Sequence, residues 1–223
     1  MTTNDEKSAG LSRREFLKIS SIAASVPLVA GPKIIEVDGQ EVAVHGPGPV
    51  PVALTVNGRR LTGEIEPRVT LLDALREHFD ITGPKRVCDR AECGACTVLI
   101  DGRAVYSCTT LAIEAQGQEI VTAEGLGGGE RPDPVQAAFV NNDAQQCGFC
   151  TPGFTVATKA FLAKNPHASD LEVAQGLAGN LCRCGTYRGI NGVVAQMSGR
   201  EPKGNAGTTM IAERLGASEK GGA

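Results

Sequence analysis

Aromatic side chains are scarce in this chain of 223 residues, and its net charge is small. There is no tryptophan, aromatic residues make up 4% of the sequence, and the formal net charge is −3. A near-neutral chain has no basic field that attracts nucleic acid, so we expect no nucleic-acid partner. With 28 glycines and so few rings, neither half of the chain can depend on an aromatic core, and additional cross-links are expected.

Long apolar runs are missing as well. A mildly apolar run from Ile19 to Ala30 is too short for a membrane-spanning helix, which needs about 20 residues. It follows the sequence SRREFLK at residues 12–18, which resembles a twin-arginine export signal. We therefore expect residues 1–30 to be a signal segment and the protein to be periplasmic or otherwise exported. An amphipathic N-terminal helix with an incidental arginine pair is the alternative.

Cysteine is the residue type that stands out. All eight cysteines lie between residues 88 and 184, in two groups of four. The first group comprises Cys88, Cys93, Cys96 and Cys108, and the second comprises Cys147, Cys150, Cys182 and Cys184. Two sets of four thiols with none left over predict two metal sites, each with four thiolate ligands.

The spacing favours iron and sulfide over zinc at the first group. C-x4-C-x2-C followed by a distant cysteine is the spacing of plant-type ferredoxins, which hold one [2Fe–2S] cluster. Zinc sites more often use two separate C-x2-C pairs. The second group combines C-x2-C with C-x-C, and this spacing alone also suits structural zinc or redox chemistry.

Disulfides are the remaining alternative, because cysteine-rich exported proteins usually form them. Cys182 and Cys184 are separated by one residue, which suits two ligands of one metal better than two disulfide partners. The twin-arginine route is associated with proteins that fold, and often receive their cofactors, in the reducing cytoplasm before export. Export is therefore compatible with thiolate-bound metal.

The first half of the chain has the pattern of a small β-rich domain. We predict a linker at residues 31–51 with one short strand at Lys33 to Val37, and a domain at residues 52–124. The predicted elements of the domain are, in order, a hairpin turning at Asn57-Gly58, a helix from Thr70 to Phe79, a hairpin turning at Asp101-Gly102, a short helix through Ile113 and a strand at Glu119 to Ala123. This order resembles the β-grasp of plant-type ferredoxins and puts three of the first four cysteines in the loop before the second hairpin.

Beyond a glycine- and proline-rich linker at residues 125–134, the apolar period becomes helical. Residues 135–199 predict a four-helix domain with Thr151 and Thr186 as helix caps. The predicted helices are Val135 to Asn141, Phe154 to Lys164, Leu171 to Ala178 and Ile190 to Met197. Residues 200–223 are glycine-rich and charged, and are predicted to be a flexible tail. The expected fold class is α+β, a β-grasp domain followed by a helical [2Fe–2S]-binding domain.

Three motifs carry a family resemblance. ECGACTV, QCGFCTPG and NLCRCGTY, in this order, resemble the small [2Fe–2S] subunit of the molybdenum hydroxylases, the xanthine oxidase and aldehyde oxidoreductase family. The resemblance covers about residues 52–198, and the export signal resembles the periplasmic aldehyde oxidoreductases in particular. The chain departs from the family at Val87 and Ala91, where many members have glycine, so the loop must accommodate a Cβ at both positions.

The resemblance implies an electron-transfer subunit with two [2Fe–2S] clusters and no catalytic residue of its own. In such enzymes a large subunit binds molybdenum on a pterin and hydroxylates an aldehyde or an N-heterocycle. Electrons then leave through the cluster of the second cysteine group and the cluster of the first, toward a flavin (FAD) subunit or a cytochrome. Gln146 and Cys150 match positions that approach the pterin cofactor, although Gln146 also suits a surface polar residue before a helix.

Two other functions fit the cysteine pattern. A free-standing double-cluster ferredoxin predicts a polar surface on the helical domain. A zinc-stabilised binding module predicts bound zinc and a colourless protein.

Overall fold

The structure is a computed structural model that describes residues 33–200 except 38, 47 and 128–130. The predicted signal segment and the predicted tail after Arg200 lie outside the described residues. The chain forms two compact units, Met1–Gly48 and Pro49–Ala223. The boundary falls within the Gly-Pro-Gly-Pro sequence at residues 46–49, which cannot continue a helix.

The described part of the first unit is an antiparallel hairpin of β1 (Lys33–Val37) and β2 (Gln40–Val44). The predicted strand at Lys33 to Val37 is confirmed, but the interpretation of the remaining residues as a linker missed β2. Gly39 has φ +77°, a left-handed conformation that suits a tight turn and that glycine adopts at little cost. The alternating QEVAV after this turn therefore returns as a second strand.

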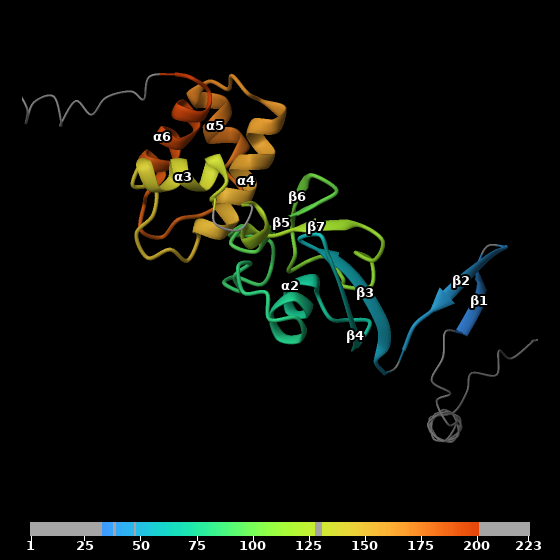
Figure 1. The fold of residues 1–223 in the computed structure, drawn as a ribbon. Helices are drawn as coiled ribbons and strands as arrows, with labels where there is room; N and C mark the ends of the chain where they lie inside the picture. Colours follow the sequence, from blue (N-terminus) through green and yellow to red (C-terminus); the bar gives the residue numbers. More distant parts are fainter. Residues whose placement is uncertain (1–32, 38, 47, 128–130, 201–223) are drawn as a thin grey trace, which may run out of the picture. The chain divides into compact units, whose positions relative to one another are not determined.

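The second unit begins with a mixed five-stranded sheet of order β4-β3-β7-β5-β6 (Figure 1). Its strands are β3 (Val50–Val56), β4 (Arg59–Ile65), β5 (Thr97–Ile100), β6 (Arg103–Tyr106) and β7 (Glu119–Val121). β3 and β7 are parallel, and the other neighbours are antiparallel. Both predicted hairpins are confirmed, with Asn57 and Asp101 at φ 51° and 49° before a glycine, as the two-residue turns of twisted hairpins require.

The predicted helix after the first hairpin is also present. The Thr70 hydroxyl accepts a hydrogen bond from the Asp73 N–H at 3.1 Å and caps α2 (Leu71–Asp73). The helix continues as a wider π-type turn, η1 (Ala74–His78). Its apolar side packs on the sheet, and the buried core there includes Val52, Leu54, Val56, Ile65, Leu71, Leu75, Val98 and Ile120.

Two details of this domain differ from the sequence prediction. The short helix through Ile113 is wrong, because residues 112–117 form consecutive turns that bury Ala112 and Ala115 in the core and include Gly117 at φ +77°. The last strand, predicted to reach Ala123, ends at Val121. Ala123 instead begins the short 3-10 turn η2 (Ala123–Gly125).

All four predicted helices are confirmed (Figure 1). They are α3 (Pro134–Asn141), α4 (Thr151–Lys164), α5 (Asp170–Gly176) and α6 (Tyr187–Met197). Phe139, Phe154, Val173, Ile190, Val193 and Val194 form much of their shared core. The predicted cap at Thr151 is wrong, because Cys150 occupies the N-cap position and Thr151 is already helical.

The sheet and the helices pack against each other within this unit. Leu99 of β5, Val156 and Ala160 of α4, and Leu126 form one buried apolar cluster. This contact places the N-terminal half of α4 beside the strand that follows the first cysteine loop. In the described part of the chain, no helix has the length and apolar character needed to cross a membrane.

Candidate metal centres

The first cysteine group lies at one edge of the sheet. Cys88, Cys93 and Cys96 are in the loop between η1 and β5, and Cys108 follows β6. Cys96 and Cys108 are buried and pack with Leu72 of α2, whereas Cys88 and Cys93 are partly exposed. The Leu72 N–H also donates to the Ser107 carbonyl at 3.0 Å. The helix thus fixes the fourth cysteine beside the loop that carries the other three.

Backbone N–H groups of this loop point at the sulfur atoms. The Ala91 N–H lies 3.4 Å from Cys108 Sγ, and the Glu92 N–H lies 3.4 Å from Cys88 Sγ. Asp89 and Ala91 both have φ 58°, so the loop accommodates the Cβ of Ala91 in a left-handed conformation. That conformation costs a non-glycine residue about 1 kcal/mol.

The four thiols of the first group form two hydrogen-bonded pairs. Cys88 pairs with Cys93, and Cys96 pairs with Cys108. Burial alone would raise the pKa of Cys88, but hydrogen bonds from Arg90, Cys93 and Glu92 outweigh it and lower the pKa to about 7. Burial raises the pKa of Cys93, and it raises the pKa of Cys96 to about 12.

The second group lies between helices. Cys147 and Cys150 are in the loop between α3 and α4, and Cys182 and Cys184 are in the loop between α5 and α6. Cys182 is buried and Cys150 is partly buried, whereas Cys147 and Cys184 are exposed. Here too the thiols form two pairs, Cys147 with Cys184 and Cys150 with Cys182.

Thr186 has a different role from the one its sequence position predicts. It occupies the N-cap position of α6 but makes no side-chain capping hydrogen bond. Its hydroxyl instead lies 3.1 Å from Cys182 Sγ, and its N–H lies 3.5 Å from the same sulfur. Burial alone would raise the pKa of Cys182, but these two groups, with hydrogen bonds from Cys150 and Gly185, lower it to about 7. Burial raises the pKa of Cys150 to about 12.

The paired arrangement fits [2Fe–2S] clusters better than single metal ions. In the described part of the chain, no three His, Cys, Asp or Glu side chains are placed to hold one metal ion, as a tetrahedral zinc site needs. A [2Fe–2S] cluster has four cysteine ligands shared between two irons, so each iron takes two thiolates. All eight cysteines are free, which argues against the disulfide alternative. Each cysteine that binds iron must lose its thiol proton.

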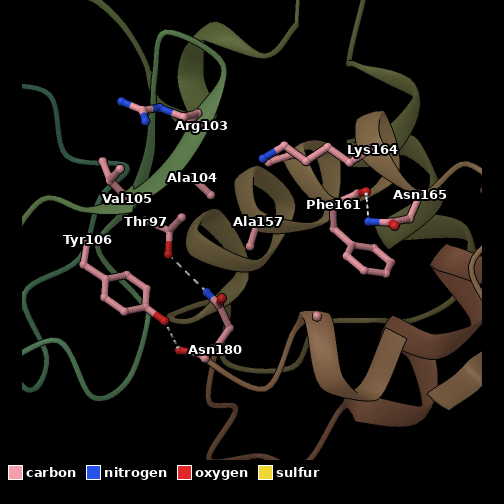
Figure 2. A pocket seen from close by; sticks show the side chains of 13 residues that line it. Thr97, Arg103, Ala104, Val105, Tyr106, Ala157, Phe161, Lys164, Asn165 and Asn180 are labelled. Atoms are coloured by element: carbon pink, nitrogen blue, oxygen red, sulfur yellow. Dashed lines mark hydrogen bonds between the residues drawn. The ribbon is translucent and has the colours of Figure 1, made fainter. Parts of the chain in front are cut away.

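The two cysteine loops touch one another, and a residue absent from the sequence prediction makes the contact. The Leu181 N–H donates to the Cys93 carbonyl at 2.9 Å, and the Asn180 side-chain amide donates to the Gly94 carbonyl at 2.9 Å. Figure 2 shows the Asn180 side chain directed toward Thr97. Beside it, the Tyr106 hydroxyl reaches the Gly179 carbonyl. We call this set of interactions the loop contact. Asn180 precedes Leu181-Cys182 in the NLCRCGTY motif, but the sequence does not show that its side chain is buried.

The surfaces around the two groups differ. The second group is bordered by three exposed apolar side chains, Phe149, Leu181 and Tyr187. Gln145, Arg183 and Arg188 are also exposed there. The rim of the first group is mostly charged and consists of Arg86, Val87, Asp89, Arg90 and Glu92, all exposed. Gln146 is exposed and lies immediately before Cys147. This position suits both an approach to the pterin cofactor and a surface polar residue before a helix.

Comparisons with known proteins agree with the site. A 2Fe-2S iron–sulfur cluster binding domain family matches residues 54–123, and a [2Fe-2S] binding domain family matches residues 122–195. The aldehyde oxidoreductase iron–sulfur-binding subunit of Escherichia coli K12 is 37% identical over 204 residues, which cover 85% of this chain and 89% of that protein. The xanthine dehydrogenase iron–sulfur-binding subunit of Escherichia coli O157:H7 is 45% identical over 63% of this chain and 89% of its own length.

A solved structure extends the likeness to the fold. Quinoline 2-oxidoreductase from Pseudomonas putida 86 contains a chain that is 38% identical and superposes with a TM-score of 0.65, over 77% of this chain and all of that one. The likeness therefore includes both the β-grasp part and the helical part. The chain belongs to the iron–sulfur subunits of the aldehyde oxidoreductase and xanthine dehydrogenase family, whose members are parts of oxidoreductase complexes.

Proposed function

We propose that this chain carries two [2Fe–2S] clusters and transfers electrons within an exported molybdenum hydroxylase of the aldehyde oxidoreductase type. The observation that carries the proposal is the division of each cysteine group into two thiol pairs, one pair for each iron. Cys88, Cys93, Cys96 and Cys108 are the proposed ligands of the first cluster, and Cys147, Cys150, Cys182 and Cys184 those of the second. A bound [2Fe–2S] cluster supplies one-electron redox chemistry.

The protein groups around the sulfurs favour an added electron. Reduction puts more negative charge on the sulfur atoms, and hydrogen-bond donors stabilise that charge. The N–H groups of Ala91 and Glu92 serve the first cluster. The hydroxyl and N–H of Thr186 serve the second.

The surface difference supports opposite roles for the two sites. Obligate subunit interfaces are apolar and contain aromatic side chains, which suits Phe149, Leu181 and Tyr187 around the second group. We assign this face to a large molybdopterin-binding subunit, with Gln146 and Cys150 directed to the pterin cofactor. The charged rim of the first group suits an electron acceptor, either an FAD subunit or a cytochrome. A free-standing ferredoxin predicts a polar helical surface, which the three apolar side chains oppose.

The first prediction concerns independent loading of the two sites. Cys96→Ser should remove the electron paramagnetic resonance signal of the first cluster and leave that of the second, because the thiolate ligands of the two clusters are separate residues. Cys150→Ser should have the reverse effect. Iron should fall from about four to about two atoms per chain in each variant. Loss of both signals from each variant would contradict two independent sites.

Thr186→Val tests the hydrogen bond to Cys182. The variant is nearly isosteric and removes one donor from the sulfur, so the midpoint potential of the second cluster should become more negative, by about 60 mV if the hydrogen bond favours the reduced form tenfold. Potentiometric titration measures both clusters, and the first should not move. Thr158→Val is the matched control, because Thr158 is buried in α4 and its hydroxyl has no hydrogen-bond partner among the described residues.

Phe149→Glu tests the subunit interface. A carboxylate placed in an apolar interface should weaken association with the large subunit at least tenfold, about 1.4 kcal/mol, without loss of iron. Affinity copurification from the native operon measures the association. Leu171→Glu, at a residue 68% exposed on α5, is the control and should copurify normally. Equal behaviour of the two variants would contradict the proposed interface.

Export rests on the SRREFLK sequence and is tested separately. Arg13→Lys with Arg14→Lys should retain the protein in the cytoplasm, because the twin-arginine pair is the signal. Cell fractionation and immunoblotting measure the distribution. The Arg59-Arg60 pair of β4 provides the control, and its double lysine variant should be exported normally. Normal export of the Arg13/Arg14 variant would exclude the twin-arginine route.

A further inference from the structure

A backbone hydrogen bond connects the two loops that carry the proposed cluster ligands. Its donor is the N–H of Leu181, the residue before Cys182, and its acceptor is the carbonyl of Cys93, at 2.9 Å. The bond thus joins the carbonyl of a proposed ligand of the first cluster to the residue that precedes a proposed ligand of the second. A change in the separation of the two loops would alter this bond.

Asn180 supports this bond from the neighbouring position. It is 6% exposed, and its side-chain nitrogen donates to the Gly94 carbonyl at 2.9 Å and to Thr97 Oγ1 at 3.3 Å. Thr97 is 2% exposed, and its hydroxyl donates to the same carbonyl at 2.6 Å. The threonine oxygen therefore remains free to accept from Asn180. The contact with Gly94 requires the side-chain nitrogen of Asn180, because an oxygen there would face the Gly94 carbonyl oxygen.

The two loops and the start of α4 approach so closely that neither Gly94 nor Gly153 could carry a Cβ in this arrangement. Gly94 has φ +67°, and a Cβ there would lie 2.5 Å from Asn180 Nδ2 and 2.6 Å from the Gly179 carbonyl oxygen. A Cβ on Gly153, at the start of α4, would lie 2.3 Å from the Gly94 carbonyl oxygen. Glycine at these two positions permits the approach but supplies no side chain that could hold it. The apolar cluster between β5 and α4 brings the sheet and the helices together, and the hydrogen bonds of the loop contact fix the cysteine loops themselves.

The loop contact also borders open space. Thr97, Tyr106 and Asn180 line a groove of about 620 Å³ between β6 and the helices (Figure 2). At its edge the Tyr106 hydroxyl donates to the Gly179 carbonyl at 2.9 Å. On the groove side the contact therefore depends on the hydrogen bonds of Asn180 and Tyr106 rather than on surrounding packing.

From this geometry we infer that Asn180 is a positioning residue that fixes the separation of the two cluster-binding loops and thereby the coupling between the clusters. The inference rests on the proposed function, because it assumes that both sites hold clusters. Asn180 is not a ligand of either cluster. It acts through the hydrogen bond between Leu181 and Cys93.

Asn180→Asp is the most direct test, since it preserves the shape and replaces the donor by a carboxylate oxygen. In the full chain purified with its partner subunit, we expect the Leu181 amide to exchange with deuterium at least tenfold faster than in the wild type. The magnetic coupling between the two reduced clusters, seen by electron paramagnetic resonance, should decrease, while both cluster signals remain. Asn165→Asp is the matched control. Asn165 lines the same groove, but its side-chain amide donates to the Phe161 carbonyl of α4 at 3.1 Å rather than to a cysteine loop. Its variant should leave both readouts unchanged.

Unchanged exchange and unchanged coupling in Asn180→Asp would overturn the inference. If that variant does not fold, Asn180→Ala decides, because it removes both side-chain hydrogen bonds without adding a charge. Exchange at Leu181 must increase in this variant, and wild-type exchange would reject the inference. Failure of the proposed function has a different signature, namely a wild-type chain that lacks the two cluster signals.

Discussion

The carbonyl oxygen of Gly94 accepts hydrogen bonds from the Thr97 N–H, the Thr97 hydroxyl and the Asn180 side chain. Gly94 lies between two cysteines of the first group, and Thr97 begins β5, so two of these bonds fix the cysteine loop to the sheet. The third fixes it to the segment that leads into Cys182. One peptide group thus connects the sheet, the first cysteine group and the second. The apolar cluster between β5 and α4 reinforces the same arrangement beside it.

Much of the fold could be predicted because its signals are local. Asn57-Gly58 and Asp101-Gly102 specify hairpin turns through their own backbone preferences, and Thr70 caps the helix that follows it. The four helices follow from the apolar period of 3.6. Two elements were predicted wrongly. The helix predicted through Ile113 is replaced by turns at residues 112–117, because burial of Ala112 and Ala115 against the sheet depends on nonlocal packing. The strand β2 was missed because only a single glycine turn precedes it.

At the candidate site too, features with local sequence signals could be predicted, and features that depend on tertiary packing could not. The two groups of four cysteines follow from spacing, and the structure brings each group together. The pairing of thiols within a group, and the contact between Asn180 and Gly94 across 86 positions of sequence, depend on tertiary packing that no local pattern encodes. The same holds for Thr186, whose hydroxyl satisfies a cysteine sulfur instead of capping α6. Gly94 has close neighbours in the helical domain, Gly179 and Asn180, which also depend on tertiary packing.

The two cysteine groups differ in the surfaces and in the hydrogen-bond donors around them, and this difference suits electron flow in one direction. Exposed apolar side chains lie beside the second group, together with polar residues such as Gln146 and Arg183, whereas the rim of the first group is mostly charged. Each face therefore fits a different kind of partner. The left-handed backbone at Asp89 and Ala91 turns N–H groups toward the first set of sulfurs, whereas a threonine hydroxyl and its N–H serve the second. The two clusters are therefore expected to have different potentials within one small protein.

The most direct test of the account is the metal and sulfide content of the anaerobically purified wild-type chain. Two [2Fe–2S] clusters predict about four irons and four acid-labile sulfides per chain and a coloured protein. About two zinc ions per chain, with no labile sulfide and no visible absorption, would contradict it.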